Sequence, residues 1–218
     1  MTWANAKIKR IYVGDTQSRP VRWLPSAYQA VEYIQSSGTQ WINTGVVAWN
    51  INSIEAEYVY PTLKNAVNIL CWARDTSATG LALLRINASN VISAYFNTQV
   101  LTDTTAVAWT KYKVKVDFQS WSQKIYINDV LKSTTTYSIT YYYSNNYYLF
   151  GFKETDSLVS SPGSFKLYSC KMYNNSTLVR DFIPCYRKSD SVIWLYDRVW
   201  KQFYTNAGSG TFTKWFDL

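Results

Sequence analysis

Two glutamates have the spacing that chemistry on a sugar chain would need. Glu55 and Glu57 stand at positions i and i+2, so in a strand they share one face. Glycoside hydrolysis requires such a pair, one residue as acid and the other as nucleophile or base. The two glutamates alternate with the apolar Ile54, Ala56 and Tyr58. We therefore expect both carboxylates on a solvated surface rather than in a catalytic site.

The rest of the chain offers no other catalytic pattern. Histidine is absent, which excludes Ser-His-Asp and Cys-His nucleophile sites within the chain and removes the commonest general base. No glycine-rich loop that would cradle a phosphate is present. We predict a protein that binds a partner and has no catalytic residues.

The cysteines and loop aspartates indicate neither a disulfide framework nor a metal site. Three cysteines at wide spacing, Cys71, Cys170 and Cys185, form no C-x-x-C motif. We expect them to be small buried hydrophobic residues in a reducing compartment. Three aspartates expected in loops lack clear ligand spacing: Asp75, Asp103 and Asp156. We predict no metal and no other cofactor.

Aromatic rings beside amides and hydroxyls could instead bind a sugar. Residues 137–148 are the densest such mixture, and a Ser-Asn-Asn centre indicates a loop. The candidate ligand-binding residues are Tyr141, Tyr143, Asn145, Asn146, Tyr147, Trp72, Arg74 and Trp121. In a strand, half of these tyrosines would instead belong to the core, and this alternative stays open. Trp41, Trp109 and Trp194 are expected to fill the core or brace sheet edges.

Charge and composition limit the partners. The formal net charge is +8, and aromatic residues make up 17% of the chain. The basic residues are scattered and alternate with apolar ones, so we expect a solvated sheet face with mild attraction for anionic surfaces and no nucleic-acid partner. Residues 1–23 lack the apolar core of a signal peptide, and no stretch is long enough to span a membrane. Synthesis and first folding are therefore expected in a cytoplasm.

Alternation of apolar and polar residues predicts an all-β chain. Residues 28–35 fit either a strand or one helical turn, and Asn128-Asp129 predicts a tight hairpin turn. The other expected strands are residues 8–13, 40–47, 54–60, 68–74, 80–87, 91–97, 109–118, 124–128, 130–135, 147–153, 164–173, 177–184, 192–196, 202–204 and 211–214. Their number and regular spacing are typical of a sandwich or barrel, and no long helix is expected.

The run Trp109-Thr-Lys-Tyr-Lys-Val-Lys-Val-Asp-Phe, followed by Lys124-Ile-Tyr-Ile-Asn-Asp-Val-Leu, resembles concanavalin A-like, laminin-G-type jelly rolls. Asp129 stands where that family usually has glycine. The resemblance implies a two-sheet antiparallel jelly-roll sandwich. Glycanases of this superfold resemble one another in a Glu-x-Asp-x-x-Glu strand, whose downstream partner is missing after Glu55 and Glu57.

Two longer stretches resemble jelly-roll domains of bacteriophage tail and other virion-surface proteins. They are Leu24-Pro-Ser-Ala-Tyr-Gln-Ala-Val-Glu-Tyr-Ile-Gln-Ser-Ser-Gly-Thr-Gln-Trp-Ile-Asn-Thr-Gly and the spaced runs between Phe165 and Phe212. Trp194 departs from the group, which usually has glycine there. The resemblance implies one jelly roll over residues 24–218 and a short N-terminal extended segment over residues 1–23.

That N-terminal segment resembles a leader found on phage structural proteins. Ile8, Ile11, Tyr12 and Val13 would form a strand that docks onto a neighbouring subunit or virion protein by β-augmentation. The alternative is a strand that packs on its own domain.

The resemblance leaves two main functions open. The first is a virion structural protein, exposed on the particle surface and made in the host bacterial cytoplasm, whose jelly roll binds a host-surface glycan or receptor. The second is a decoration or tail-attachment protein that contacts only other virion proteins. A glycan hydrolase is a further alternative. A homo-oligomer such as a trimer is expected to cover exposed aromatic residues.

Overall fold

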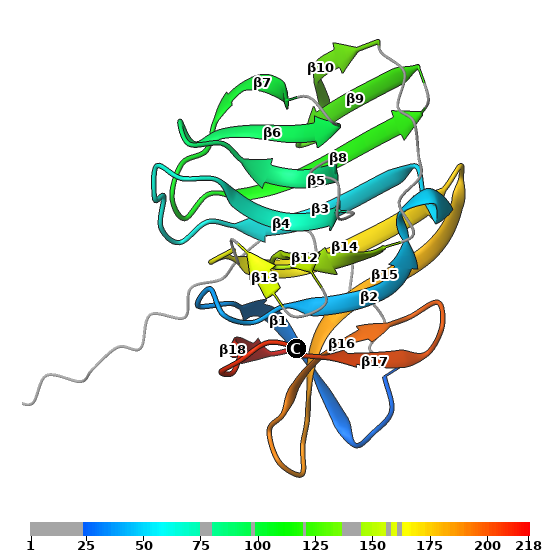
Figure 1. Ribbon diagram of the computed structural model, residues 1–218. Coiled ribbons are helices and arrows are strands. Elements are labelled where there is room, and N and C mark those ends of the chain that lie inside the picture. Colours follow the sequence, from blue (N-terminus) through cyan, green and yellow to red (C-terminus); the bar gives the residue numbers. More distant parts are fainter. Residues whose placement is uncertain are drawn as a thin grey trace, which may run out of the picture.

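The computed structural model is a sandwich of two antiparallel sheets stacked face to face (Figure 1). It describes residues 24–74, 80–96, 99–119, 121–136, 145–155, 158–160 and 163–218. The predicted N-terminal segment, residues 1–23, lies outside these ranges, and so does the docking strand predicted within it over residues 8–13. Among the described residues the one helical element is the 3-10 turn η2 (Ala48–Asn50).

The larger sheet has ten strands and the smaller sheet has six. In spatial order the larger contains β10 (Val130–Thr135), β9 (Ser122–Ile127), β8 (Lys111–Gln119), β3 (Ser53–Val59), β14 (Lys166–Asn174), β1 (Tyr28–Gln35), β15 (Thr177–Arg187), β16 (Ile193–Asp197) and β17 (Gln202–Thr205), with β18 (Thr213–Asp217) paired to β1. The smaller contains β2 (Ile42–Val47), β11 (Asn146–Leu149), β4 (Asn68–Arg74), β5 (Gly80–Ile86), β6 (Val91–Phe96) and β7 (Gln99–Thr105). A separate pair is formed by β12 (Phe152–Thr155) and β13 (Leu158–Ser160).

The alternation pattern located most of these strands. Residues 28–35 form strand β1 rather than a helical turn. Asn128 and Asp129 both have positive φ, at 51° and 66°, as the predicted hairpin turn requires. The expected strand over residues 147–153 was wrong, because Phe150 at φ 69° breaks it between β11 and β12. The alternation pattern did not predict strand β7. The buried residue at the centre of this strand is the polar Thr102, so apolar and polar residues do not alternate there.

The core fills the space between the two sheets and is rich in aromatic rings. Phe150 and Phe165 stack with ring centroids 5.0 Å apart, and both are fully buried. Tyr58 and Tyr60 lie against Phe165, and Phe212 closes the cluster from the segment before β18. In β8 and β9 buried apolar residues alternate with partly exposed ones, which places the lysines of these strands on the outer face of the larger sheet.

The cysteines are buried and free, as expected. Burial raises the pKa values of the Cys71 and Cys170 thiols well above the usual value for cysteine, and it raises the pKa of the Cys185 thiol to about 12. Each thiol is therefore neutral and inaccessible at neutral pH. We expect none to react with Ellman's reagent in the native protein and all three to react in denaturant. Rapid modification of the native protein at any of the three would contradict the burial of the thiols.

None of the described residues forms a helix with the length and apolarity that a bilayer crossing needs. Within the described ranges no group of three or more Cys, Asp or Glu side chains is arranged to hold a metal ion.

Candidate functional site

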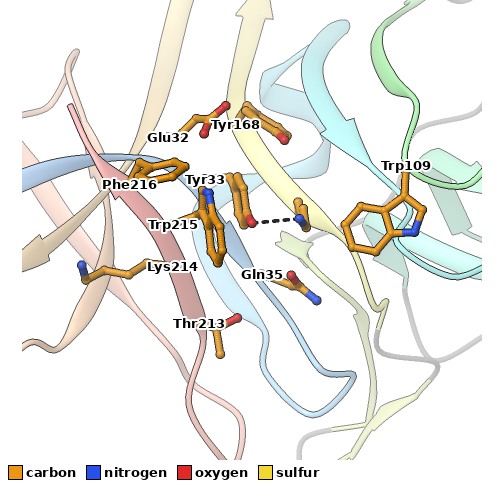
Figure 2. Close-up of a pocket in the computed structure, with 10 residues that line it drawn as sticks. Glu32, Tyr33, Gln35, Trp109, Tyr168, Thr213, Lys214, Trp215 and Phe216 are labelled. Atoms are coloured by element: carbon orange, nitrogen blue, oxygen red, sulfur yellow. Dashed lines mark hydrogen bonds between the residues drawn. The ribbon is translucent and has the colours of Figure 1, made fainter. Parts of the chain in front are cut away.

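An open groove of about 850 Å³ lies on the outer face of the larger sheet, at strands β1, β14 and β18 (Figure 2). Trp109, from the turn that precedes β8, forms its opposite wall. The lining side chains come from four separate parts of the sequence: Glu32, Tyr33, Gln35, Trp109, Lys166, Tyr168, Thr213, Lys214, Trp215 and Phe216.

Strand register explains why these side chains face the same way. Gln35 of β1 is paired with Lys166 of β14 and with Thr213 of β18. Tyr33, two residues before Gln35, is paired with Trp215. Directly opposed residues and residues at i and i+2 share a sheet face. The register therefore places the five side chains in two adjacent rows on the outer face.

Lys166 occupies the floor of the groove, between two aromatic rings. Its Nζ donates a hydrogen bond of 2.8 Å to the Tyr33 hydroxyl, drawn as a dashed line in Figure 2. The same atom lies 4.3 Å from the ring centre of Tyr33 and 4.4 Å from that of Trp109. Both rings offer a negative face to the ammonium group. The side chain is 9% exposed, so its charge is held at one place beneath the groove.

Trp109 is the most unusual residue of the site. Its ring is 67% exposed, so the expectation that it fills the core or braces an edge was wrong. Its backbone has φ 65°, and its N–H donates to the Tyr60 carbonyl at 2.9 Å. Positive φ is rare for a bulky side chain and is tolerated where the surroundings fix it. This conformation turns the indole away from the core and over Lys166.

The upper end of the groove carries Tyr168 and Glu32 (Figure 2). The Tyr168 ring lies 5.2 Å from that of Tyr33, and Lys111 Nζ lies 4.2 Å from its centre. Burial, with smaller contributions from Glu32 and Tyr33, raises the pKa of Tyr168 to about 12. The phenol therefore stays protonated at neutral pH and can donate a hydrogen bond, while Glu32 can accept one.

Strand β18 supplies the second wall. Trp215 and Phe216 contact each other edge to face at 5.1 Å, and the Trp215 ring is 52% exposed. Lys214 Nζ is 3.2 Å from Asp217 at the rim. The groove thus presents exposed rings from Trp109 and Trp215 on either side of a polar floor. Such a combination suits a ligand with both apolar faces and hydroxyl groups.

Beyond the groove, the outer face is a ladder of ion pairs. Lys111 lies 2.8 Å from Glu57, while Lys113 and Lys171 both lie within 4 Å of Glu55. The two glutamates singled out in the sequence are partly exposed on this outer face, each beside at least one lysine, and neither lines the groove.

Two solved structures share the sandwich. A protein from Bacteroides ovatus to which carbohydrate binding is attributed has a TM-score of 0.60 and 11% identity over 86% of this chain. This chain spans 60% of that protein's length. The CBM40 domain of the Ruminococcus gnavus IT-sialidase, solved with α2,3-sialyllactose, has a TM-score of 0.52 and 14% identity over 65% of this chain and 89% of its own length. No family model matches the sequence, and no curated protein matches it.

The fold is a jelly-roll sandwich. This confirms the predicted fold class, an all-β, two-sheet antiparallel architecture.

The predicted ligand-binding residues that the structure describes lie elsewhere on the jelly roll. Trp72 is buried on the smaller sheet beside Tyr95. Tyr147 is fully buried in the core, which is the alternative that alternation left open, and Asn146 donates to Asn43 at 3.0 Å. Asn145 is half-buried, and its carbonyl accepts a hydrogen bond from the Ala48 N–H.

Trp121 and Arg74 do not line the groove either. Trp121 is exposed in the turn between β8 and β9, at the far end of β8 from Trp109. Arg74 ends strand β4 of the smaller sheet. Tyr141 and Tyr143 lie outside the described residues. Of the predicted residues that the structure describes, none lines the groove.

Proposed function

We propose that the chain is a carbohydrate-binding module and that the groove between Trp109 and Trp215 is its glycan site. The observation that carries the proposal is the pair of exposed indoles on either side of a floor of hydrogen-bonding groups. The flat apolar face of a sugar ring packs on an indole, while its hydroxyls need donors and acceptors such as Gln35, Thr213 and Glu32. Two proteins of similar fold add support. Carbohydrate binding is attributed to one of them, and the other was solved with sialyllactose.

The proposal is for binding without catalysis. The groove contains one carboxylate, that of Glu32, whereas hydrolysis of a glycosidic bond requires an acid together with a nucleophile or base. A module of this kind would hold a glycan in place and leave it unchanged.

We further propose that the module is a component of a bacteriophage particle. It would be exposed at the surface of the particle and would have other virion proteins as partners. This proposal rests on the sequence resemblance of residues 24–45 and of the runs between Phe165 and Phe212. Host-surface glycan would then be the ligand. A protein that contacts only virion proteins would instead show no affinity for glycans.

Binding of the full chain to a glycan array tests the function. We expect saturable binding to a subset of glycans, with no release of sugar products after prolonged incubation. Titration calorimetry with the best ligand should give one site per chain. Absence of binding across the array would overturn the proposal, and product release would show a hydrolase instead.

A further inference from the structure

The charge of Lys166 has no counterpart in the described structure. Its Nζ contacts are the Tyr33 hydroxyl and the rings of Tyr33 and Trp109. Among the described residues no carboxylate lies within ion-pair distance of it. A buried ammonium without an anionic partner is costly, and two aromatic faces offset only part of the lost hydration.

Five other lysines of this sheet are each paired with a carboxylate. The pairs are Lys111 with Glu57, Lys113 with Glu55 and Asp129, Lys115 with Asp117, Lys171 with Glu55, and Lys214 with Asp217. Each of these lysines is also more exposed than Lys166. Lys124 of β9 also makes no ion pair among the described residues, but it is partly exposed, so water can solvate its charge. Lys166 differs from all six because it combines burial with the lack of a carboxylate partner.

The Tyr33 hydroxyl completes an anion-binding arrangement. Because its oxygen accepts the hydrogen bond from Lys166, its own proton is free to donate elsewhere. In Figure 2 the Tyr33 hydroxyl points toward the Lys166 ammonium, and both groups lie in the groove beside Trp109. An ammonium and a phenol at 2.8 Å can together donate to the two oxygens of one carboxylate.

We infer that the groove selects glycans that carry a carboxylate, such as uronic or sialic acid residues, and that Lys166 with Tyr33 binds this carboxylate. The inference rests on the proposed glycan-binding function and specifies its ligand class. The ligand's carboxylate pairs with Lys166, while its sugar ring packs on Trp109 or Trp215. Glu32 lies beside Tyr168 at the upper end of the groove, where it can accept hydrogen bonds from sugar hydroxyls. The net charge of +8 favours the approach of an acidic ligand.

The test compares each acid with its own methyl ester, which removes the ligand's charge and keeps its shape. The probes are trigalacturonate and the methyl glycoside of N-acetylneuraminic acid, titrated against the full chain. We expect at least one acid to bind at least about 30-fold more tightly than its ester. If neither acid binds more tightly than its methyl ester, although neutral glycans bind, the inference fails and the proposed function stands. If no glycan of any charge binds, both fail.

A variant assigns the preference to Lys166. Lys166→Met keeps a chain of similar length between the two rings and removes the charge, so we expect it to abolish the preference for the acid. Lys166→Arg should retain most of it. Lys115→Met is the matched control, because Lys115 also lies near a tyrosine ring, at 5.5 Å, but is paired with Asp117 outside the groove. A preference that survives in Lys166→Met would overturn the assignment, and the ester comparison decides the ligand class even if this variant does not fold.

Discussion

Replacing Asp197 with alanine is expected to lower the free energy of unfolding by about 3–5 kcal/mol, because it leaves a buried arginine without its carboxylate. Asp197 is fully buried, and its Oδ2 lies 3.4 Å from Arg180 Nε. Its Oδ1 accepts the backbone N–H groups of Asp181 and Val199, each at 3.0 Å. The change therefore removes one charge and the acceptor of two backbone hydrogen bonds from a corner of the sheet, where the end of β16 pairs with β15.

The neighbouring residues form a reciprocal pair that makes this corner rigid. Asp181 accepts from Arg198 Nε at 2.9 Å, so consecutive residues of β15 are tied to residues at the end of β16. The Arg180 guanidinium also packs on Trp200, 4.3 Å from its ring. Since β15 pairs with β1, the strand that carries Tyr33 and Gln35, loss of this corner is expected to destabilise the groove together with the fold.

Urea unfolding of Asp197→Ala, Asp197→Asn and Asp190→Ala measures the effect. Asp190 pairs with Arg187 at an exposed site, so its replacement should lower the free energy of unfolding far less than that of Asp197. Asp197→Asn keeps an oxygen for the two backbone N–H groups and should fall between the other two. An equal loss in Asp197→Ala and Asp190→Ala would show that burial of the pair does not matter.

The fold could be predicted from the sequence because its signals are local. Lys113, Val114 and Lys115 alternate along one strand, and alternation sets the sheet face of each residue. Asn128-Asp129 fixed a hairpin through backbone conformation alone. Both features are independent of how distant strands pair.

The groove could not be predicted because it depends on non-local pairing. Tyr33 and Lys166 are separated by 133 positions and meet because β1 pairs with β14, while the pairing of β1 with β18 adds Trp215. Trp109 looked like the apolar start of a strand, and only its positive φ turns the ring outward. Conversely, the tyrosine-rich run was the densest aromatic segment, but Tyr147 within it belongs to the core. Aromatic density does not distinguish a binding platform from core packing.

Replacing Trp109 with alanine is expected to weaken glycan binding at least about 30-fold, since the loss of a central aromatic contact in an interface typically costs about 2 kcal/mol or more. The change also removes one of the two rings that contact the Lys166 ammonium, which lies 4.4 Å from the indole. The side chain is 67% exposed and adds little to the core, so the stability of the fold should change by much less than its affinity.

Trp121→Ala is the matched control for this experiment. Trp121 is 69% exposed, close to the value for Trp109, and was itself a candidate from the sequence, but it lies at the other end of β8. Calorimetric titration of both variants with the best array ligand, after thermal unfolding has shown that both are folded, separates the two sites. If Trp121→Ala loses affinity and Trp109→Ala does not, the glycan site lies at the β8–β9 turn and the groove is not the binding surface. Because the two residues have the same side chain and nearly the same exposure, a difference in affinity between the variants reflects position on the jelly roll.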